Sequence, residues 1–255
     1  MLALFFVMVV AAGPPARAGI DSSYNTRLEE LLSRLTAQGW PEEDLLRVLG
    51  DPRVTLYPEI VERRGKGLNY RGREFGLLTK KSVREGKTVL RANRNLLQKI
   101  EAAYGVGKEV LVAILRVETN FGRVKGSYPV FNSLLTMTLI ENRRSAWAVG
   151  ELEQLLLMSL EEERDPLSVK GSWAGAFGLP QFIPSSFRKY GADGNRDGTV
   201  DLDNPADAFA SIANYLKSFG WSRQDAVKNK GAVYAYNHCD NYVQAVLAYA
   251  RAIRK

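Results

Sequence analysis

The chain has 255 residues, of which 45% are hydrophobic and 25% charged, and its formal net charge is +7. These proportions are ordinary for a globular protein, so they exclude disorder over most of the chain and allow one large domain or two modest ones. The positive charge favours an acidic partner, such as nucleic acid, anionic lipid or an anionic polymer of the cell wall, or reflects a generally basic surface. The densest basic run, ERRGKGLNYRGR at 62–73, has no helical stripe of Lys and Arg, so we expect no nucleic-acid partner.

The N-terminus carries an apolar run, LALFFVMVVAA, that is too short to span a bilayer comfortably. The run is followed by Ala16-Arg17-Ala18, which has the pattern of a signal-peptidase site. We therefore expect residues 1–18 to be a secretory signal peptide and the protein to be exported to the periplasm or cell envelope. No Lys or Arg precedes the run, and a short membrane anchor is the alternative. No Cys lies near the cleavage site, which argues against a lipoprotein, and Cys239 alone forms no intrachain disulfide.

Helical periodicity fills most of the remaining chain, and convincing alternating strands are absent. Pro41 at a first helical position and acids in the turn after it mark the start of the second helix. The Gly- and aromatic-rich stretch 170–191 is interpreted as a short helix, a loop and another short helix. We predict a mainly α protein with an N-terminal helical portion at 19–95 and a core at 96–255. The other expected helices are 24–38, 41–49, 79–104, 107–118, 132–141, 145–163, 205–219 and 224–252, the last interrupted around YNHCDN.

The loop DGNRDGTVDLDNPAD at 193–207 has oxygen-bearing residues at the spacing of the first half of an EF-hand loop. The second half departs from that pattern, because position 12 is Asn204 where an EF-hand has a bidentate Glu. Asp207, which lies further on at the start of a helix, is the expected replacement. We predict one structural Ca²⁺, with an Asp- and Gly-rich surface turn as the alternative. The predicted ligands are Asp193, Asn195, Asp197, Thr199 through its backbone carbonyl, and Asp207.

Glu118 ends an apolar helical stretch and shares one helical face with Leu111 and Leu115. A carboxylate on an apolar face is costly when it is ionised, so its pKa rises and it suits the role of a general acid near neutral pH. The alternative is a structural Glu that satisfies loop amides or pairs with a nearby arginine, namely Arg116, Arg123 or Arg143.

Two later stretches, SWAGAFGLPQF at 172–182 and YAYNHCDNY at 234–242, combine amides and hydroxyls with small and aromatic residues. Carbohydrate is bound by such sets, because sugars form hydrogen bonds at their edges and stack by their faces. A sugar cleft with a buried acid predicts a glycosidase-like enzyme. Ordinary glycosidases use two carboxylates, whereas only Glu118 is in a catalytic setting here. Either the fold supplies a second acid or the substrate supplies the nucleophile.

Six motifs in this order, over about residues 50–250, resemble the lytic murein transglycosylases of the membrane-bound B type. They are VLVAILRVETNFGR, ENRRSAW, KGSWAGAFGLPQFIPSS, DGNRDGTVDLDNPADA, SIANYLKSFGW and YAYN. The resemblance implies a lysozyme-like α core flanked by smaller subdomains, with an EF-hand-like calcium loop. It also implies an enzyme that cleaves the β-1,4 bond between N-acetylmuramic acid and N-acetylglucosamine in peptidoglycan without water. The muramoyl 6-hydroxyl attacks its own anomeric carbon and leaves a 1,6-anhydro end, which fits a site with one acid.

Carried over by motif, the resemblance implies that Glu118 is the catalytic acid and then the base that takes the 6-hydroxyl proton. Ser172 and Gln181 would bind and position the sugars and the Glu. Arg143 and Arg144 would approach the muramoyl lactyl or peptide carboxylates. The residues expected to line the cleft are Tyr215, Tyr236, Asn237 and Tyr242.

We therefore expect a monomeric lytic transglycosylase that acts on peptidoglycan glycan strands, needs no organic cofactor and is able to associate with other cell-wall enzymes. One alternative is a lysozyme-like hydrolase that admits water at the same site. Another is a catalytically silent peptidoglycan-binding protein, against which the presence of Glu118 argues.

Overall fold

The computed structural model describes residues 22–62, 69–70, 72 and 75–254. This part of the chain is mostly helical, with eleven α-helices, two short 3-10 helices and one two-stranded antiparallel sheet. The predicted mainly α class is therefore confirmed. The expected signal peptide at 1–18 lies outside the described residues. Within them, no helix is both long enough and apolar enough to cross a membrane.

The elements follow the chain with short connections. The helices before the sheet are η1 (Ser22–Tyr24), α1 (Asn25–Ala37), α2 (Glu42–Leu49), η2 (Pro58–Ile60), α3 (Lys80–Ala92), α4 (Arg94–Tyr104) and α5 (Lys108–Thr119). The sheet pairs β1 (Tyr128–Pro129) with β2 (Lys170–Gly171), and between these strands lie α6 (Val130–Leu139) and α7 (Ser145–Glu161). The last helices are α8 (Pro184–Tyr190), α9 (Pro205–Ser218), α10 (Ala226–Tyr236) and α11 (Asp240–Arg254).

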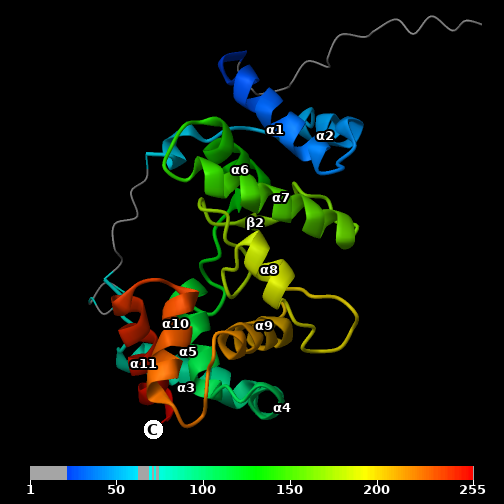
Figure 1. Ribbon diagram of the computed structural model, residues 1–255. Coiled ribbons are helices and arrows are strands. Elements are labelled where there is room, and N and C mark those ends of the chain that lie inside the picture. Colours follow the sequence, from blue (N-terminus) through cyan, green and yellow to red (C-terminus); the bar gives the residue numbers. More distant parts are fainter. Residues whose placement is uncertain (1–21, 63–68, 71, 73–74, 255) are drawn as a thin grey trace, which may run out of the picture.

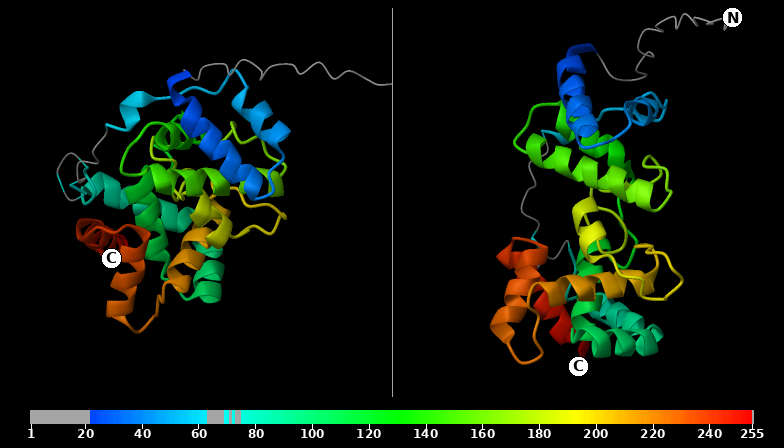
Figure 2. Two further views of the ribbon diagram at one scale, coloured as in Figure 1. Left: turned by 45° about the horizontal axis from the view of Figure 1, so that its top comes forward. Right: turned by 45° about the vertical axis from the view of Figure 1, so that its right-hand side comes forward.

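The helices form two groups with α8 between them (Figure 1 and Figure 2). Helices α1 and α2 lie at one end of the molecule, beside α6 and α7, and the other end holds α3, α4, α5, α9, α10 and α11. Contacts of α8 with both α7 and α9 join the two groups. The chain passes from one group to the other after α5, so the end of α5 points towards the region between them (Figure 1).

Helix α5 is the central helix of its group and packs against α3, α4, α9 and α11. All of its residues from 109 to 117 are buried, as expected for a helix that is apolar nearly all round. Asn120 and Phe121 then adopt left-handed conformations, with φ of 49° and 59°, which turn the chain sharply after the helix. Glu118 therefore lies in the last turn of a helix whose body is buried and whose end reaches the region between the groups.

Two sequence expectations were wrong in detail. The helix predicted over 79–104 is divided at Asn93, whose side-chain amide donates to the Val89 carbonyl and so ends α3. The first short helix expected in 170–191 is absent, since Gly175, Gly178 and Gln181 all have positive φ there. The predicted break in 224–252 is confirmed between α10 and α11.

Helix α3 belongs spatially with the second group. It lies before residue 95, the predicted end of the N-terminal portion, yet it packs against α5 and α11 from beyond that boundary. The packing of α1 is different, because α1 contacts α2 and α6. Buried apolar side chains of both groups form one continuous core.

Candidate active site

Glu118 is held by a hydrogen bond from a buried tyrosine. Tyr242, in the first turn of α11, is fully buried, and its Oη donates to Glu118 Oε1 at 2.5 Å. The α5–α11 packing that aligns these two residues is among the most extensive in the molecule. The structure therefore brings together two predicted site residues that lie 124 positions apart in the chain.

Burial raises the pKa of Glu118 from 4.5 to about 7, and the hydrogen bond from Tyr242 opposes part of that rise. No other acidic side chain in the described part of the chain contributes to this pKa. The pairing of Glu118 with a nearby arginine, kept open from the sequence, is not observed, since no ion pair involves Glu118 among the described residues. A carboxyl group with a pKa near neutrality both donates and accepts a proton at physiological pH.

Tyrosines form a wall beside Glu118. The Tyr236 ring is nearly parallel to that of Tyr242, with 6.3 Å between centroids and 7° between planes. Tyr215 meets Tyr236 edge-on at 4.9 Å, and its hydroxyl donates to the Ala235 carbonyl. Burial raises the pKa of Tyr236 and of Tyr242 well above 10, and the charge of Glu118 adds to the rise, so both hydroxyls stay protonated.

Tyr70 is a site residue that the sequence analysis missed. Its ring lies edge-on to Tyr242, with 5.5 Å between centroids, and it forms a hydrogen bond with the Asn237 side chain. Burial and the charge of Glu118 raise the pKa of Tyr70 to about 12. The sequence signal was weak, because Tyr70 lies in the basic run 62–73, which was considered only for nucleic-acid binding.

The segment after β2 supplies the predicted Ser172 and Gln181. Ser172 Oγ accepts the Ala174 and Ala176 amides at 3.3 and 3.1 Å, so it fixes a tight turn where a short helix had been expected. Gln181 Nε2 donates to the carbonyls of Gly178 and Lys125, at 2.9 and 3.2 Å.

This segment lies against the tyrosine wall. The Tyr236 hydroxyl donates to the Pro180 carbonyl at 2.6 Å, which places Gln181 next to that contact. Gln181 Oε1 makes no hydrogen bond to the described residues, so it remains able to accept one.

The two predicted arginines differ in their surroundings. Arg144, at the start of α7, places its guanidinium 5.5 Å from the centroid of the Trp173 ring, so it lies against the segment that contains Ser172. Arg143 is exposed in the same turn, and no contact between it and the Glu118 cluster is seen among the described residues.

Asp207 fastens the predicted calcium loop. Its carboxylate is completely buried and accepts the backbone amides of Gly194, Asn195 and Asp201, at 2.9, 3.4 and 2.8 Å. At the start of the loop, Asp193 Oδ2 accepts the Gly198 amide at 2.9 Å, which joins positions 1 and 6. Within the loop these carboxylates therefore bind amides.

The donor set of the loop has the hard oxygen chemistry that Ca²⁺ prefers. Asp197 accepts from the Thr199 amide and hydroxyl and from the Asn195 side chain, so all five predicted ligands belong to one hydrogen-bonded loop. No three His, Cys, Asp or Glu side chains in the described ranges are arranged to hold a metal ion. Calcium binding thus stays a prediction that the donor chemistry supports.

Backbone contacts connect this loop to the end of α5. The Leu179 amide donates to the Leu202 carbonyl at 2.9 Å, and the Leu179 carbonyl accepts from Thr119 Oγ1 at 3.1 Å. Gly178 permits this approach, since a Cβ atom there would lie 2.3 Å from the Cβ of Leu202. The loop is therefore two hydrogen bonds away from the neighbour of Glu118.

Comparisons with known proteins agree with this architecture. Residues 24–230 match the family described as Transglycosylase SLT domain. The chain is 36% identical over 225 residues to the Membrane-bound lytic murein transglycosylase B of Escherichia coli, covering 85% of this chain but only 60% of that relative.

Two solved structures have the same fold. The Escherichia coli lytic transglycosylase SLT35 in complex with calcium superposes with a TM-score of 0.84, at 25% identity, covering 93% of this chain and 96% of that one. The soluble lytic transglycosylase SltB1 from Pseudomonas aeruginosa gives a TM-score of 0.80 at 26% identity, covering 88% and 97%. With the family match extending over most of its length and a relative above 30% identity, the chain belongs to the transglycosylase SLT domain family.

Proposed function

We propose that this protein is a peptidoglycan lytic transglycosylase, which cleaves the β-1,4 bond between N-acetylmuramic acid and N-acetylglucosamine without water. The observation that carries the proposal is the environment of Glu118. It has a pKa of about 7, and no other acid among the described residues contributes to that value. One carboxyl group that is able to give and then take a proton suits a reaction in which the substrate supplies the nucleophile.

The reaction divides into two proton transfers. Protonated Glu118 gives its proton to the glycosidic oxygen as the bond to the muramoyl anomeric carbon breaks. The muramoyl 6-hydroxyl then attacks that carbon, and the Glu118 carboxylate takes the hydroxyl proton. The product has a 1,6-anhydro end, no water is consumed, and Glu118 returns to its starting state. Because the Tyr242 hydroxyl donates to the carboxyl group in the structure, it also stabilises the carboxylate between the two steps.

We assign substrate contacts to the groups beside Glu118. The faces of Tyr236 and Tyr215 suit the apolar faces of sugars, and the free Gln181 Oε1 suits a sugar hydroxyl or amide. Asn237 is held by Tyr70, and Ser172 sets the shape of the turn below. Arg144, against Trp173, and the exposed Arg143 suit the lactyl or peptide carboxylates.

The remaining expectations form part of the same proposal. A Ca²⁺ ion bound to the 193–207 loop would hold that loop in place and, through Leu202 and Leu179, steady the turn that follows Glu118. The protein would be exported to the cell envelope, act as a monomer on glycan strands, need no organic cofactor and associate with other cell-wall enzymes. The division into a portion at 19–95 and a core at 96–255 is kept as a proposal.

Digestion of purified sacculi followed by mass spectrometry tests the function. Products with 1,6-anhydromuramoyl ends, each one water lighter than a reducing end, are expected. Reducing ends would instead identify a lysozyme-like hydrolase. Binding of sacculi with no release of fragments would identify a silent binding protein, and either of these results overturns the proposal.

A further inference from the structure

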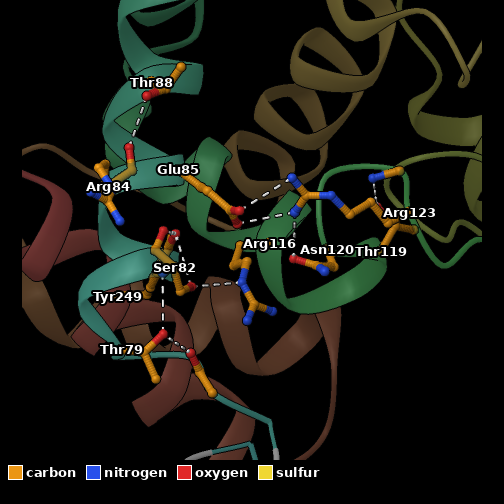
Figure 3. A network of polar contacts seen from close by, with 12 residues as sticks. Thr79, Ser82, Arg84, Glu85, Thr88, Arg116, Thr119, Asn120, Arg123 and Tyr249 are labelled. Atoms are coloured by element: carbon orange, nitrogen blue, oxygen red, sulfur yellow. Dashed lines mark hydrogen bonds and ion pairs between the residues drawn. The ribbon is translucent and has the colours of Figure 1, made fainter.

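A small polar pocket lies between the N-terminus of α3 and the C-terminal end of α5, apart from the residues used above. Its volume is about 320 Å³. Figure 3 shows the polar contacts around it, with Arg116 and Arg123 reaching from the α5 side and Ser82 and Glu85 from α3. The side chains that matter for its chemistry are Thr79, Lys81, Ser82, Glu85, Arg116 and Arg123.

Arg116 is a buried cation in this pocket, with only 7% of its surface exposed. Its Nε donates to Ser82 Oγ at 2.9 Å and its Nη2 donates to the Phe75 carbonyl at 3.1 Å. Both of these partners are neutral. Arg116 forms no ion pair with an acidic side chain of the described residues, and its Nη1 has no hydrogen-bond partner among them. Buried charges in proteins are normally paired, so this arrangement calls for an anion.

The other charges in the pocket do not supply that anion. Glu85 is the single acidic residue of the lining, and it pairs with Arg123 at 3.1 Å. Lys81 adds a third cation at the start of α3, where the helix dipole also favours negative charge. Burial and the nearby Arg123 charge lower the pKa of Arg116, while Tyr249 and Glu85 only partly oppose them. The pocket therefore carries three cations against one carboxylate.

We propose that this pocket binds an oxyanion and that, in the proposed function on which this inference rests, the anion is a carboxylate of the peptide carried by the glycan strand. A planar guanidinium with free N–H groups is suited to carboxylate, and the Thr79 and Ser82 hydroxyls add smaller polar groups. Arg116 precedes Glu118 by two residues on α5, and Arg123 follows in the next loop. The pocket and the candidate active site thus share one helix end. Free phosphate has the same chemistry, and the experiment separates the sources.

Binding to the full-length protein is measured first with two small probes, inorganic phosphate and N-acetylalanine, at constant ionic strength. Arg116→Gln should weaken both by at least about tenfold, the loss expected for a charge-assisted hydrogen bond. Glu85→Gln should strengthen both severalfold, because it removes the only negative charge of the lining. Arg84→Gln is the matched control: Arg84 is exposed on the same helix but does not line the pocket. It should change binding by less than about twofold, since exposed charges are screened.

Kinetics on three substrates identify the source of the anion. A chito-oligosaccharide carries no carboxylate, a naked muramoyl glycan carries lactyl carboxylates, and a peptide-bearing glycan carries peptide carboxylates. Arg116→Gln should raise KM for the peptide-bearing glycan alone, with kcat little changed. Equal increases for both muramoyl substrates, or a response to inorganic phosphate alone, would overturn the assignment to the peptide.

Opposite effects of Arg116→Gln and Glu85→Gln are the signature that a purely structural Arg116 would not give. If Arg116→Gln fails to fold, Arg123→Gln and Glu85→Gln carry the test with the same expected signs. Folded variants that all bind the probes as Arg84→Gln does would overturn the oxyanion site. Failure of the wild-type protein to cleave any of the substrates would count against the proposed function, while the probe measurements would still decide the pocket.

Discussion

Replacing Glu118 by Gln separates proton transfer from packing, because Gln has nearly the same shape and still accepts the Tyr242 hydrogen bond. The variant is unable to protonate the glycosidic oxygen or to accept the 6-hydroxyl proton. General acid–base catalysis contributes about 10²–10⁴-fold, so the release of 1,6-anhydromuropeptides from sacculi should fall by at least that factor. Binding of glycan strands should be close to that of the wild-type protein.

The same substitution has a pH-dependent effect on stability. The pKa of Glu118 is about 7 in the folded protein and 4.5 in its ordinary state, so the folded protein holds this proton more tightly than the unfolded chain does. An ionised Glu118 therefore destabilises the folded state above pH 7, by about 3 kcal/mol at most, and this cost disappears as the pH falls from 7 to below 4.5. The amide of the Glu118→Gln variant never ionises, so the variant should melt about 5–10 °C higher than wild type at pH 8 and at nearly the same temperature at pH 4.

Glu109→Gln provides the matched control for both measurements. Glu109 lies in the first turn of the same helix and pairs with Lys108 and Arg254, at 3.9 and 3.6 Å. That variant should keep its activity and gain no stability at pH 8. Wild-type activity of Glu118→Gln would show that the catalytic acid lies elsewhere. A lower melting temperature than wild type at pH 8 would refute the burial argument, even if activity were lost.

Tyr242→Phe removes a hydrogen bond that favours the ionised form of Glu118, so the alkaline limb of the pH–rate profile should move upward by about one pH unit; an unchanged limb would mean that the bond is absent in solution. Asp207→Ala should lower stability by about 3 kcal/mol with or without calcium, measured by denaturant unfolding, because three buried amides lose their acceptor. Calcium should raise the wild-type melting temperature but not that of Asp193→Ala, and indifference of the wild type to both calcium and chelator would exclude the loop as a site. N-terminal sequencing of the exported protein should begin at about Gly19, whereas an intact Met1 on a membrane-embedded product would contradict the signal peptide.

Much of the helical architecture followed from the sequence, because periodicity and end signals are local properties. Pro205 and the capping Asn204 mark the start of α9, and the positive φ of Gly105 ends α4, within a residue or two of expectation. The stretch 170–191 misled because its Gly and Ala content is typical of close helix packing. The Ser172 side chain instead competes for the Ala174 and Ala176 amides and holds a turn.

The sequence by itself determined that Glu118 ends an apolar helix face, and that a carboxyl group there should have a raised pKa. Only the tertiary structure decided how this is achieved, since Tyr242 and Tyr70 reach Glu118 and one another from segments distant in the chain. Local spacing records which residues share a face of one helix, whereas desolvation and long-range hydrogen bonds depend on which elements cover that face. The unpaired charge of Arg116 belongs to the same class, because only the packing of α3 against α5 buries it beside Ser82 and away from an acidic partner among the described residues.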